Sequence, residues 1–202
     1  GKEWKTRRRH GRHARARAGT AAAPGGAREP RAVDDVGASG VEAVGRRADL
    51  VEAVAAEIRG KGRKSLVLTA DVTAPGSLEA FREAVVKAFG SVEILLNCAG
   101  RTKRTPTLKV SLDEWNAIME TNLTGTLRGC QVFGEHMIER KYGRIINIAS
   151  LGSYVAMLEV AAYSASKSAV MSLTQSLAIE WAKHLDVPYD GPSVVIEEGT
   201  FK

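Results

Sequence analysis

The alternation of short apolar runs with amphipathic segments is the feature that most constrains how this chain folds. Apolar runs typical of buried strands cover residues 65–70, 92–96 and 143–149. Between them lie segments whose apolar residues recur every three or four positions, as on one face of a helix. Strands that alternate with helices form a mostly parallel sheet, because each helix carries the chain back to the same end of the sheet. We therefore predict an α/β domain with helices on both faces of its sheet.

Helix signals divide the rest of the chain. Residues 48–59 have high helix propensity, and a second helix is predicted over about 77–89. Ser111 and Glu114 form a capping box, which begins a long third helix. The last helix is predicted from Tyr163 onward, because the apolar residues after it again step by three and four. The inward face predicted for the third helix comprises Leu112, Trp115, Met119, Leu123, Leu127 and Cys130.

Three polar side chains near the last predicted strand and helix suit carbonyl chemistry. Tyr163 and Lys167 are i and i+4 on a helix, so their side chains lie on one face, one turn apart. An ammonium stabilises a nearby phenolate, which lowers the phenol's pKa from about 10 and suits it to exchange protons with a carbinol oxygen. Ser150, at the end of a strand, can hydrogen-bond the same oxygen. Taken alone, the spacing favours a simpler interpretation: a half-exposed tyrosine beside a solvated lysine.

The neighbouring motifs reverse that preference. Ser150 stands thirteen residues before Tyr163, Asn-Cys-Ala-Gly occupies 97–100, and Asn122 lies in Met-Glu-Thr-Asn-Leu-Thr-Gly. In this order and spacing the chain resembles the short-chain dehydrogenase/reductase family over roughly residues 45–184, and most of all its 3-oxoacyl-carrier-protein reductase and gluconate 5-dehydrogenase-like branches. The resemblance implies a three-layer, Rossmann-type fold. It also implies NAD(P)-dependent oxidation of an alcohol or reduction of a carbonyl.

The resemblance assigns a role to each residue of the expected catalytic set. Tyr163 would be the general acid/base, and Lys167 would lower its pKa and bind the nicotinamide ribose. Ser150 would orient the substrate oxygen. Asn122 would hold a water that links Lys167 to solvent and relays protons. An ordinary polar residue on a helix surface is the alternative interpretation of Asn122.

A dinucleotide site follows from the same resemblance. It places Asp71 and Val72 against the adenine and Arg46 near the 2′-phosphate of NADP, although an ordinary surface arginine is an equal interpretation of Arg46. No acidic residue stands where the family prefers NAD, so NADP(H) is favoured and NAD(H) is possible. The residues expected to contact the cofactor are Arg46, Asp71, Val72, Asn97, Ala99, Gly100, Tyr163 and Lys167.

The backbone of residues 97–100 is expected to lie against the adenosine ribose. Gly100 permits a close approach there, because it has no side chain. The alternative interpretation is a plain turn from strand to loop with Asn97 as its cap.

The first 43 residues differ from the rest. Residues 1–31 carry two Lys and eight Arg against Glu3 and Glu29, a charge of +8, so the remainder of the +6 chain carries −2. Residues 1–32 contain no Val, Ile, Leu, Phe, Tyr or Met, which predicts disorder. Three interpretations compete. The segment is a basic arm that binds nucleic acid or anionic surfaces, or it is an organelle transit peptide. The third interpretation is that it is foreign to the family, because of a shifted reading frame or a mis-called start.

The family likeness also weakens at both ends. Residues 1–44 contain no match to the family's T-G-x-x-x-G-x-G phosphate turn. After His184 only a short strand over 193–197 is expected, without the substrate lid and final strand of the family. We therefore expect a basic segment over 1–43 and a Rossmann-type domain over 44–202 that is incomplete at both ends.

Composition limits the location, the metal content and the kinds of partner that we expect. No apolar run approaches the roughly 18 residues that a membrane span needs, so we expect a cytoplasmic protein. Cys98 and Cys130 are predicted to be reduced thiols, and no metal site is expected, His10 and His13 included. The expected partners are a small carbonyl or alcohol substrate and, by resemblance, further copies in a homodimer or homotetramer.

Two rival functions remain at this point. A catalytically impaired fragment or pseudoenzyme would keep the sheet but lack the phosphate turn, and it would not bind NADPH saturably. A nucleic-acid-binding protein would use the basic arm, and its affinity would fall steeply with salt. We rank the second rival lowest, because only Trp4 interleaves with the arginines of the arm.

Overall fold

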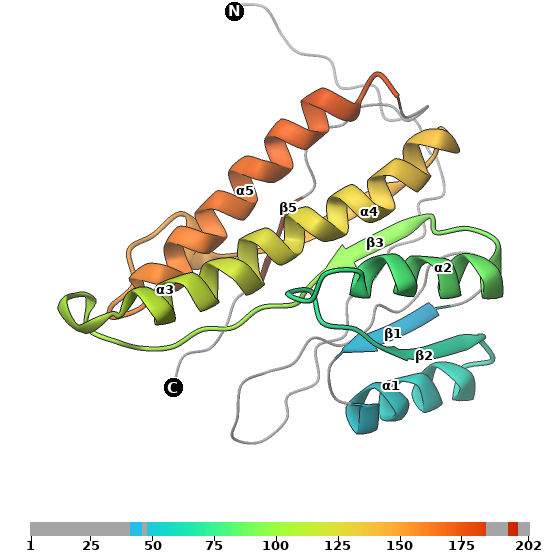
Figure 1. Cartoon of the computed structure of the whole chain (residues 1–202), viewed down its shortest axis with the longest axis horizontal. Coiled ribbons are helices and arrows are strands. Elements are labelled where there is room, and N and C mark those ends of the chain that lie inside the picture. Colours follow the sequence, from blue (N-terminus) through green and yellow to red (C-terminus); the bar gives the residue numbers. More distant parts are fainter. Residues whose placement is uncertain (1–40, 46–47, 185–193, 198–202) are drawn as a thin grey trace, which may run out of the picture.

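The structure, a computed structural model, describes residues 41–45, 48–184 and 194–197 (Figure 1). Within these residues all strand pairings are parallel: β1 with β2, β3 with β4, and β4 with β5. The predicted α/β architecture with a parallel sheet is therefore confirmed, and so is the short strand expected near residue 194. The strands are β1 (Val41–Gly45), β2 (Ser65–Thr69), β3 (Ile94–Asn97), β4 (Arg144–Ser150) and β5 (Val194–Glu197).

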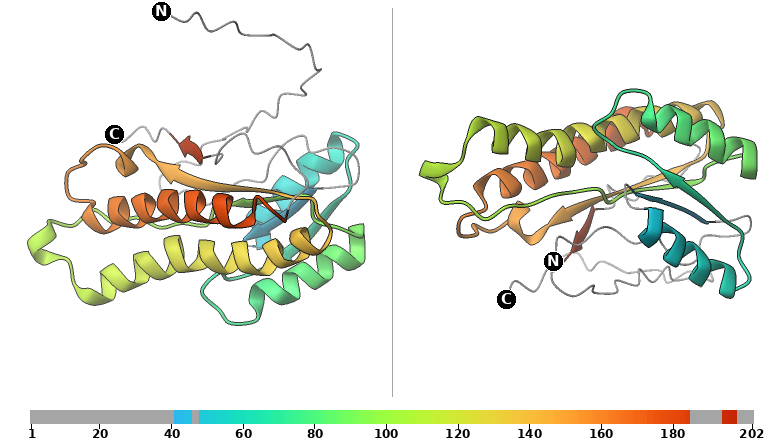
Figure 2. Two further views of the ribbon diagram at one scale, coloured as in Figure 1. Left: turned by 90° about the horizontal axis from the view of Figure 1, so that it is seen from above. Right: turned by 60° about the horizontal axis from the view of Figure 1, so that its bottom comes forward.

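Helices lie on both faces of β1 and β2. In Figures 1 and 2, α1 lies on one side of β1 and β2, and α2 and α4 lie on the other. None of the described helices combines the length and apolarity that crossing a bilayer requires. The helices are α1 (Ala48–Gly60), α2 (Ser77–Phe89), α3 (Leu112–Met119), α4 (Gly125–Glu139) and α5 (Ala161–Trp181).

One apolar core joins two groups of strands. In the described part of the chain, β1–β2 and β3–β4–β5 are separate hydrogen-bonded sheets. Leu66 of β2 and Leu95 of β3 both pack against the same buried cluster. Phe81 of α2 meets Phe133 of α4 edge to face in this core, with ring centroids 5.7 Å apart. Burial of apolar surface therefore holds the two sheets together. The buried members of the cluster are Val85, Val92, Phe133 and Met137.

The single long third helix that was predicted is interrupted in the structure. It begins as predicted, because Ser111 Oγ accepts a hydrogen bond from Glu114 N at 3.1 Å. A π turn, Glu120–Thr124, then separates α3 from α4 and inserts an extra residue into the helical repeat. Leu112 was predicted to face inward but is 78% exposed. It is the first residue of α3, and its Cα–Cβ bond points back past the start of the helix.

Other predicted boundaries are close to the observed ones. The helix predicted over 77–89 is α2 with the same limits. The strand predicted over 92–96 forms two residues later, and the last helix begins at Ala161 rather than Tyr163. Differences of this size reflect the fraying of element ends.

Replacing Gly129 with alanine is expected to destabilise the fold. A Cβ on Gly129 of α4 would overlap Asn97 Oδ1 of β3. Asn97 cannot turn away without losing its 2.9 Å hydrogen bond to Asn147. We expect the free energy of unfolding to fall by about 1–3 kcal/mol in urea denaturation, as in other overpacked cores. Gly60→Ala is the matched control, since no heavy atom lies within 4 Å of its added Cβ; an equal loss in both variants would contradict this explanation.

The stability of the fold is expected to fall as the pH drops through the histidine range. His136 Nε2 accepts a hydrogen bond from Val92 N at 3.4 Å. Burial lowers the pKa of His136 below its ordinary value of 6.5, and the charges of Arg140 and Arg82 lower it further. Near pH 6.5 the unfolded chain therefore binds more protons than the folded one, which favours unfolding.

The measurement is the melting temperature between about pH 7.5 and 5.5, above the range where carboxylates titrate. The wild type should lose more stability over this window than His136→Gln. Parallel curves for the two proteins would show that His136 does not carry the effect.

Candidate active site

Tyr163 and Lys167 lie side by side at the start of α5, as their spacing predicts. Lys167 Nζ is 5.9 Å from the centroid of the Tyr163 ring. The lysine is only 5% exposed, and its ammonium donates to the carbonyl of Ile148 on β4 at 2.7 Å. The charge is thus held inside the protein, next to the phenol and at the carboxyl end of β4. The alternative of a solvated lysine is wrong.

Asn122 occupies the π turn and is completely buried. Its Oδ1 accepts from Arg101 N at 2.8 Å, and its Nδ2 donates to Arg101 O at 2.9 Å. Nδ2 also donates to Ser166 Oγ on α5 at 2.9 Å, and Ser166 Oγ donates to the carbonyl of Tyr163 at 2.7 Å. The interpretation of Asn122 as a surface residue is therefore wrong, because its amide joins the loop after β3 to the first turns of α5.

Gly100 brings the Asn-Cys-Ala-Gly segment to the same place. A Cβ on Gly100 would lie 3.5 Å from Asn122 Oδ1 and 3.6 Å from Lys167 Nζ. Residues from the ends of β3 and β4, from the π turn and from α5 thus converge. Of these, Asn122, Lys167 and Gly100 were expected in the site from the sequence.

Ser150 is the last residue of β4 and is 4% exposed. Its Oγ accepts from Gly152 N at 3.1 Å, and its own N–H donates to Ser153 Oγ at 3.3 Å. A Cβ on Gly152 would lie 2.9 Å from Ser164 Oγ and 3.6 Å from Ser150 Oγ. Gly152 therefore lets the first turn of α5 approach the end of β4, where Ser150 is fixed by the short helical turn that follows it.

A second buried polar network lies beneath the site. Asn97 Nδ2 donates to Asn147 Oδ1 at 2.9 Å, and Asn147 Nδ2 donates to Thr174 Oγ1 at 3.0 Å. These bonds link β3, β4 and α5. The side chain of Asn97 thus faces the protein interior, which leaves only its backbone for the cofactor contact expected of it. Sequence reasoning missed Asn147, although an asparagine inside an apolar strand run must find partners.

Cys98 and Cys130, both within the described residues, are thiols and not joined in a disulfide, as predicted. Cys130 is fully buried beside the asparagine network, and Cys98 is half-buried. Burial raises the pKa of the Cys130 thiol to about 11, although its hydrogen bonds with Asn147 and Asn97 act in the opposite direction. Cys130 is therefore a neutral packing residue.

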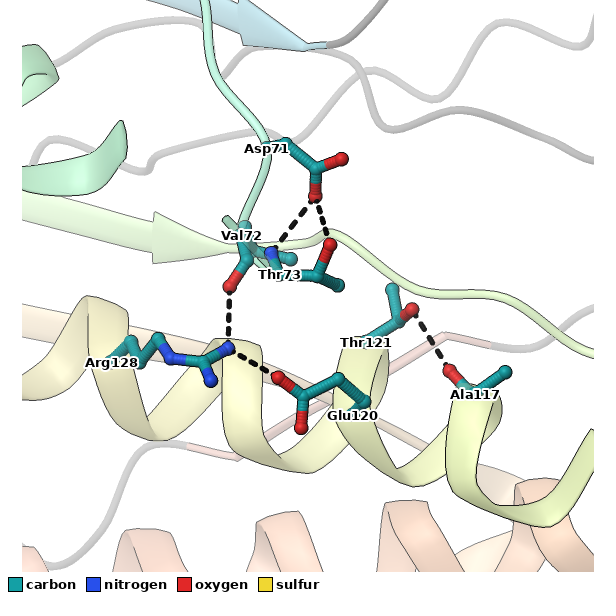
Figure 3. Close-up of polar contacts among 7 residues, drawn as sticks. All are labelled: Asp71, Val72, Thr73, Ala117, Glu120, Thr121 and Arg128. Carbon is teal, nitrogen blue, oxygen red and sulfur yellow. Dashed lines mark hydrogen bonds and ion pairs between the residues drawn. The ribbon is translucent and has the colours of Figure 1, made fainter. Parts of the chain in front are cut away.

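The residues expected at the adenine lie in the loop after β2 (Figure 3). Asp71 Oδ1 accepts from Thr73 N at 2.9 Å and from Thr73 Oγ1 at 2.7 Å. The carbonyl of Val72 accepts from Arg128 of α4. These bonds set the shape of the loop and attach it to α4, and sequence reasoning missed Arg128. Arg46 and most of the basic segment over 1–43 lie outside the described residues.

Comparison with known proteins identifies relatives over most of this region. The family model for short chain dehydrogenase matches residues 30–192. D-threitol dehydrogenase of Mycolicibacterium smegmatis is 36% identical over 159 residues, which cover 78% of this chain and 61% of that protein. The 2-dehydro-3-deoxy-D-gluconate 5-dehydrogenase of Escherichia coli is 37% identical over 129 residues, 63% of this chain and 51% of that protein. The chain therefore spans little more than half the length of these relatives.

Solved structures agree with this assignment. A gluconate 5-dehydrogenase from Burkholderia cenocepacia, in complex with NADP and tartrate, superposes with a TM-score of 0.67 at 31% identity. The match covers 71% of this chain and 56% of that one. A xylitol dehydrogenase solved with NAD+ gives a TM-score of 0.69 at 28% identity over 71% of this chain and 56% of that one. The fold, the motifs and these matches together establish that the chain belongs to the short-chain dehydrogenase family.

Proposed function

We propose that the protein is an NAD(P)-dependent oxidoreductase that interconverts an alcohol and a carbonyl, with Tyr163 as general acid/base. The observation that carries the proposal is the buried Lys167 ammonium, 5.9 Å from the Tyr163 ring centroid. A buried positive charge stabilises the phenolate that forms when Tyr163 gives up its proton. This arrangement suits a phenol that exchanges protons near neutral pH.

Ser150 is proposed to orient the substrate oxygen. Its Oγ accepts a hydrogen bond from Gly152 N, so the hydroxyl proton can be donated to a substrate oxygen. In the reducing direction Tyr163 would protonate that oxygen while Ser150 holds it. Asn122 is proposed to complete the proton relay. Its amide bonds both backbone groups of Arg101 and so fixes the chain beside Lys167.

The nicotinamide cofactor would supply the hydride. Gly100 supports this fit, because its backbone lies directly beside Asn122 and Lys167, within contact distance of an added Cβ. We propose that the cofactor also contacts Tyr163 and Lys167 at its ribose and the Asp71–Val72 loop at its adenine. The position expected for Arg46, near the 2′-phosphate, favours NADP(H), and NAD(H) is possible. The full set proposed is Arg46, Asp71, Val72, Asn97, Ala99, Gly100, Tyr163 and Lys167.

The names of the relatives support a polar substrate. The curated relatives include a threitol dehydrogenase and gluconate-type dehydrogenases, all named for polyhydroxylated compounds. We therefore propose a small polyol or sugar acid, or the matching keto compound. A homodimer or homotetramer built through α4 and α5 is proposed from the family resemblance, and a cytoplasmic location remains a prediction.

A catalytically impaired family member is the second candidate. It is favoured by the absence of the T-G-x-x-x-G-x-G phosphate turn from residues 1–44. Thermal melts with excess NADPH or NADH separate the two candidates, because a ligand that binds only the folded state raises the melting temperature. A melting temperature that rises with either cofactor supports the enzyme. A melting temperature that neither cofactor raises supports the impaired protein.

Replacing Tyr163 with phenylalanine is expected to abolish turnover while sparing cofactor binding. Losing the general acid/base should lower kcat by about 100-fold or more. The assay follows nicotinamide absorbance with polyols and sugar acids, and thermal melts with cofactor test binding. Tyr142→Phe is the matched control, because Tyr142 is 50% exposed and precedes β4 at its far end. Full activity in Tyr163→Phe would refute the assignment.

A further inference from the structure

Arg128 of α4 reaches the loop after β2, which is 56 residues earlier in the chain (Figure 3). Its Nη1 donates to the carbonyl of Val72 at 3.0 Å. The same nitrogen lies 2.6 Å from Glu120 Oε1, in the π turn. The guanidinium therefore bridges a backbone carbonyl of the loop and a carboxylate that sets its direction. Arg128 is one third exposed and Glu120 is 40% exposed, so the bridge lies at the edge of the site.

The side chain of Val72 is held by the same helix. A Cβ on Gly125, one turn before Arg128, would lie 2.6 Å from Val72 Cγ2 and 2.9 Å from Val72 Cβ. The glycine thus lets Val72 sit directly on the start of α4. Val72 is fixed twice, through its side chain at Gly125 and through its carbonyl at Arg128.

The rest of the loop is ordered by its own hydrogen bonds. Asp71 accepts from Thr73 N and Oγ1, and Asp71 N donates to Ser77 Oγ at 2.9 Å. These bonds set the shape of the loop but do not attach it to α4. Arg128 of α4 supplies a polar link between this loop and the helix.

The bridge also adjoins the catalytic groups. Glu120 belongs to the same π turn as Asn122, whose amide holds Arg101 and Ser166. The π turn therefore contacts both Arg128, which bonds the expected adenine loop, and the residues around Lys167. A shift of the loop relative to α4 would therefore change the distance between the proposed adenine and nicotinamide parts of the site.

We propose that Arg128 is a positioning residue that fixes the Asp71–Val72 loop for the adenosine half of the cofactor, with Glu120 setting its orientation. The proposal rests on the proposed function and adds a residue to that site. It requires that loss of the guanidinium weakens adenosine binding more than nicotinamide binding, because the guanidinium bonds the adenine loop itself, at the carbonyl of Val72.

The test compares Arg128→Met with Arg82→Met. Arg82 makes the same kind of bridge elsewhere, to the carbonyl of Val132 at 3.3 Å and to Glu135 at 3.4 Å. Both variants lose one guanidinium, so general destabilisation is matched. Dissociation constants are measured by calorimetry on the full chain for NADPH, NADH, adenosine 2′,5′-bisphosphate and nicotinamide mononucleotide.

In Arg128→Met the dissociation constants of the dinucleotides and of the adenosine probe should rise about 3- to 10-fold, the size of one hydrogen bond. Binding of nicotinamide mononucleotide should not change. The KM for cofactor should rise while kcat at saturating cofactor stays unchanged. Arg82→Met should match the wild type in all of these. Glu120→Gln should shift adenosine binding in the same direction by a smaller factor.

Three outcomes overturn the proposal. Equal adenosine affinity in Arg128→Met and the wild type removes the positioning role but leaves the proposed function standing. Equal losses in both arginine variants show a general structural effect. A wild type that binds none of the four ligands defeats the proposed function and this inference together. If Arg128→Met does not fold, Arg128→Lys and Glu120→Gln give the same comparison, since one ammonium cannot reproduce the two-sided bridge.

Discussion

The buried amide of Asn122 is the interaction on which the arrangement of the site depends. Away from water, an asparagine side chain must satisfy its hydrogen bonds within the protein. Asn122 does so with both backbone groups of Arg101 and with Ser166. The loop after β3, the π turn and the start of α5 are thereby held in one place. Tyr163 and Lys167 take their positions from that junction, because Ser166 lies between them and bonds the carbonyl of Tyr163.

A second set of buried bonds fixes α5 further along its length. Asn147 of β4 joins Asn97 of β3 to Thr174 of α5. Helix α5 is thus attached near its start through Ser166 and about two turns later through Thr174. Two attachments define the direction of a helix as well as its position. Such a frame suits the catalytic roles proposed for Tyr163, Lys167 and Ser150, since catalytic groups need rigid support.

Membership of the short-chain dehydrogenase family ties this frame to a known kind of chemistry. The chain spans 61% of the threitol dehydrogenase and 51% of the gluconate-type relative, so activity and substrate remain proposals. The described residues nevertheless include four parts of the proposed site. Those are the phenol–ammonium pair, the serine at the strand end, the buried asparagine and the ordered loop after β2. The buried asparagine and the loop after β2 also depend on contacts with segments that are far away in the chain, Asn122 with Arg101 and Ser166, and Val72 with Arg128.

The sequence by itself determined the α/β class, the limits of α2 and the pairing of Tyr163 with Lys167, because periodicity and i, i+4 spacing are local properties. Only the tertiary structure decided that Leu112 is exposed, that a π turn interrupts the third helix and that Asn122 is buried. Arg128 and Val72 meet across 56 residues, and Asn97 and Asn147 across 50. No local pattern encodes such contacts, because they exist only after the parallel strands and the helices between them have packed together.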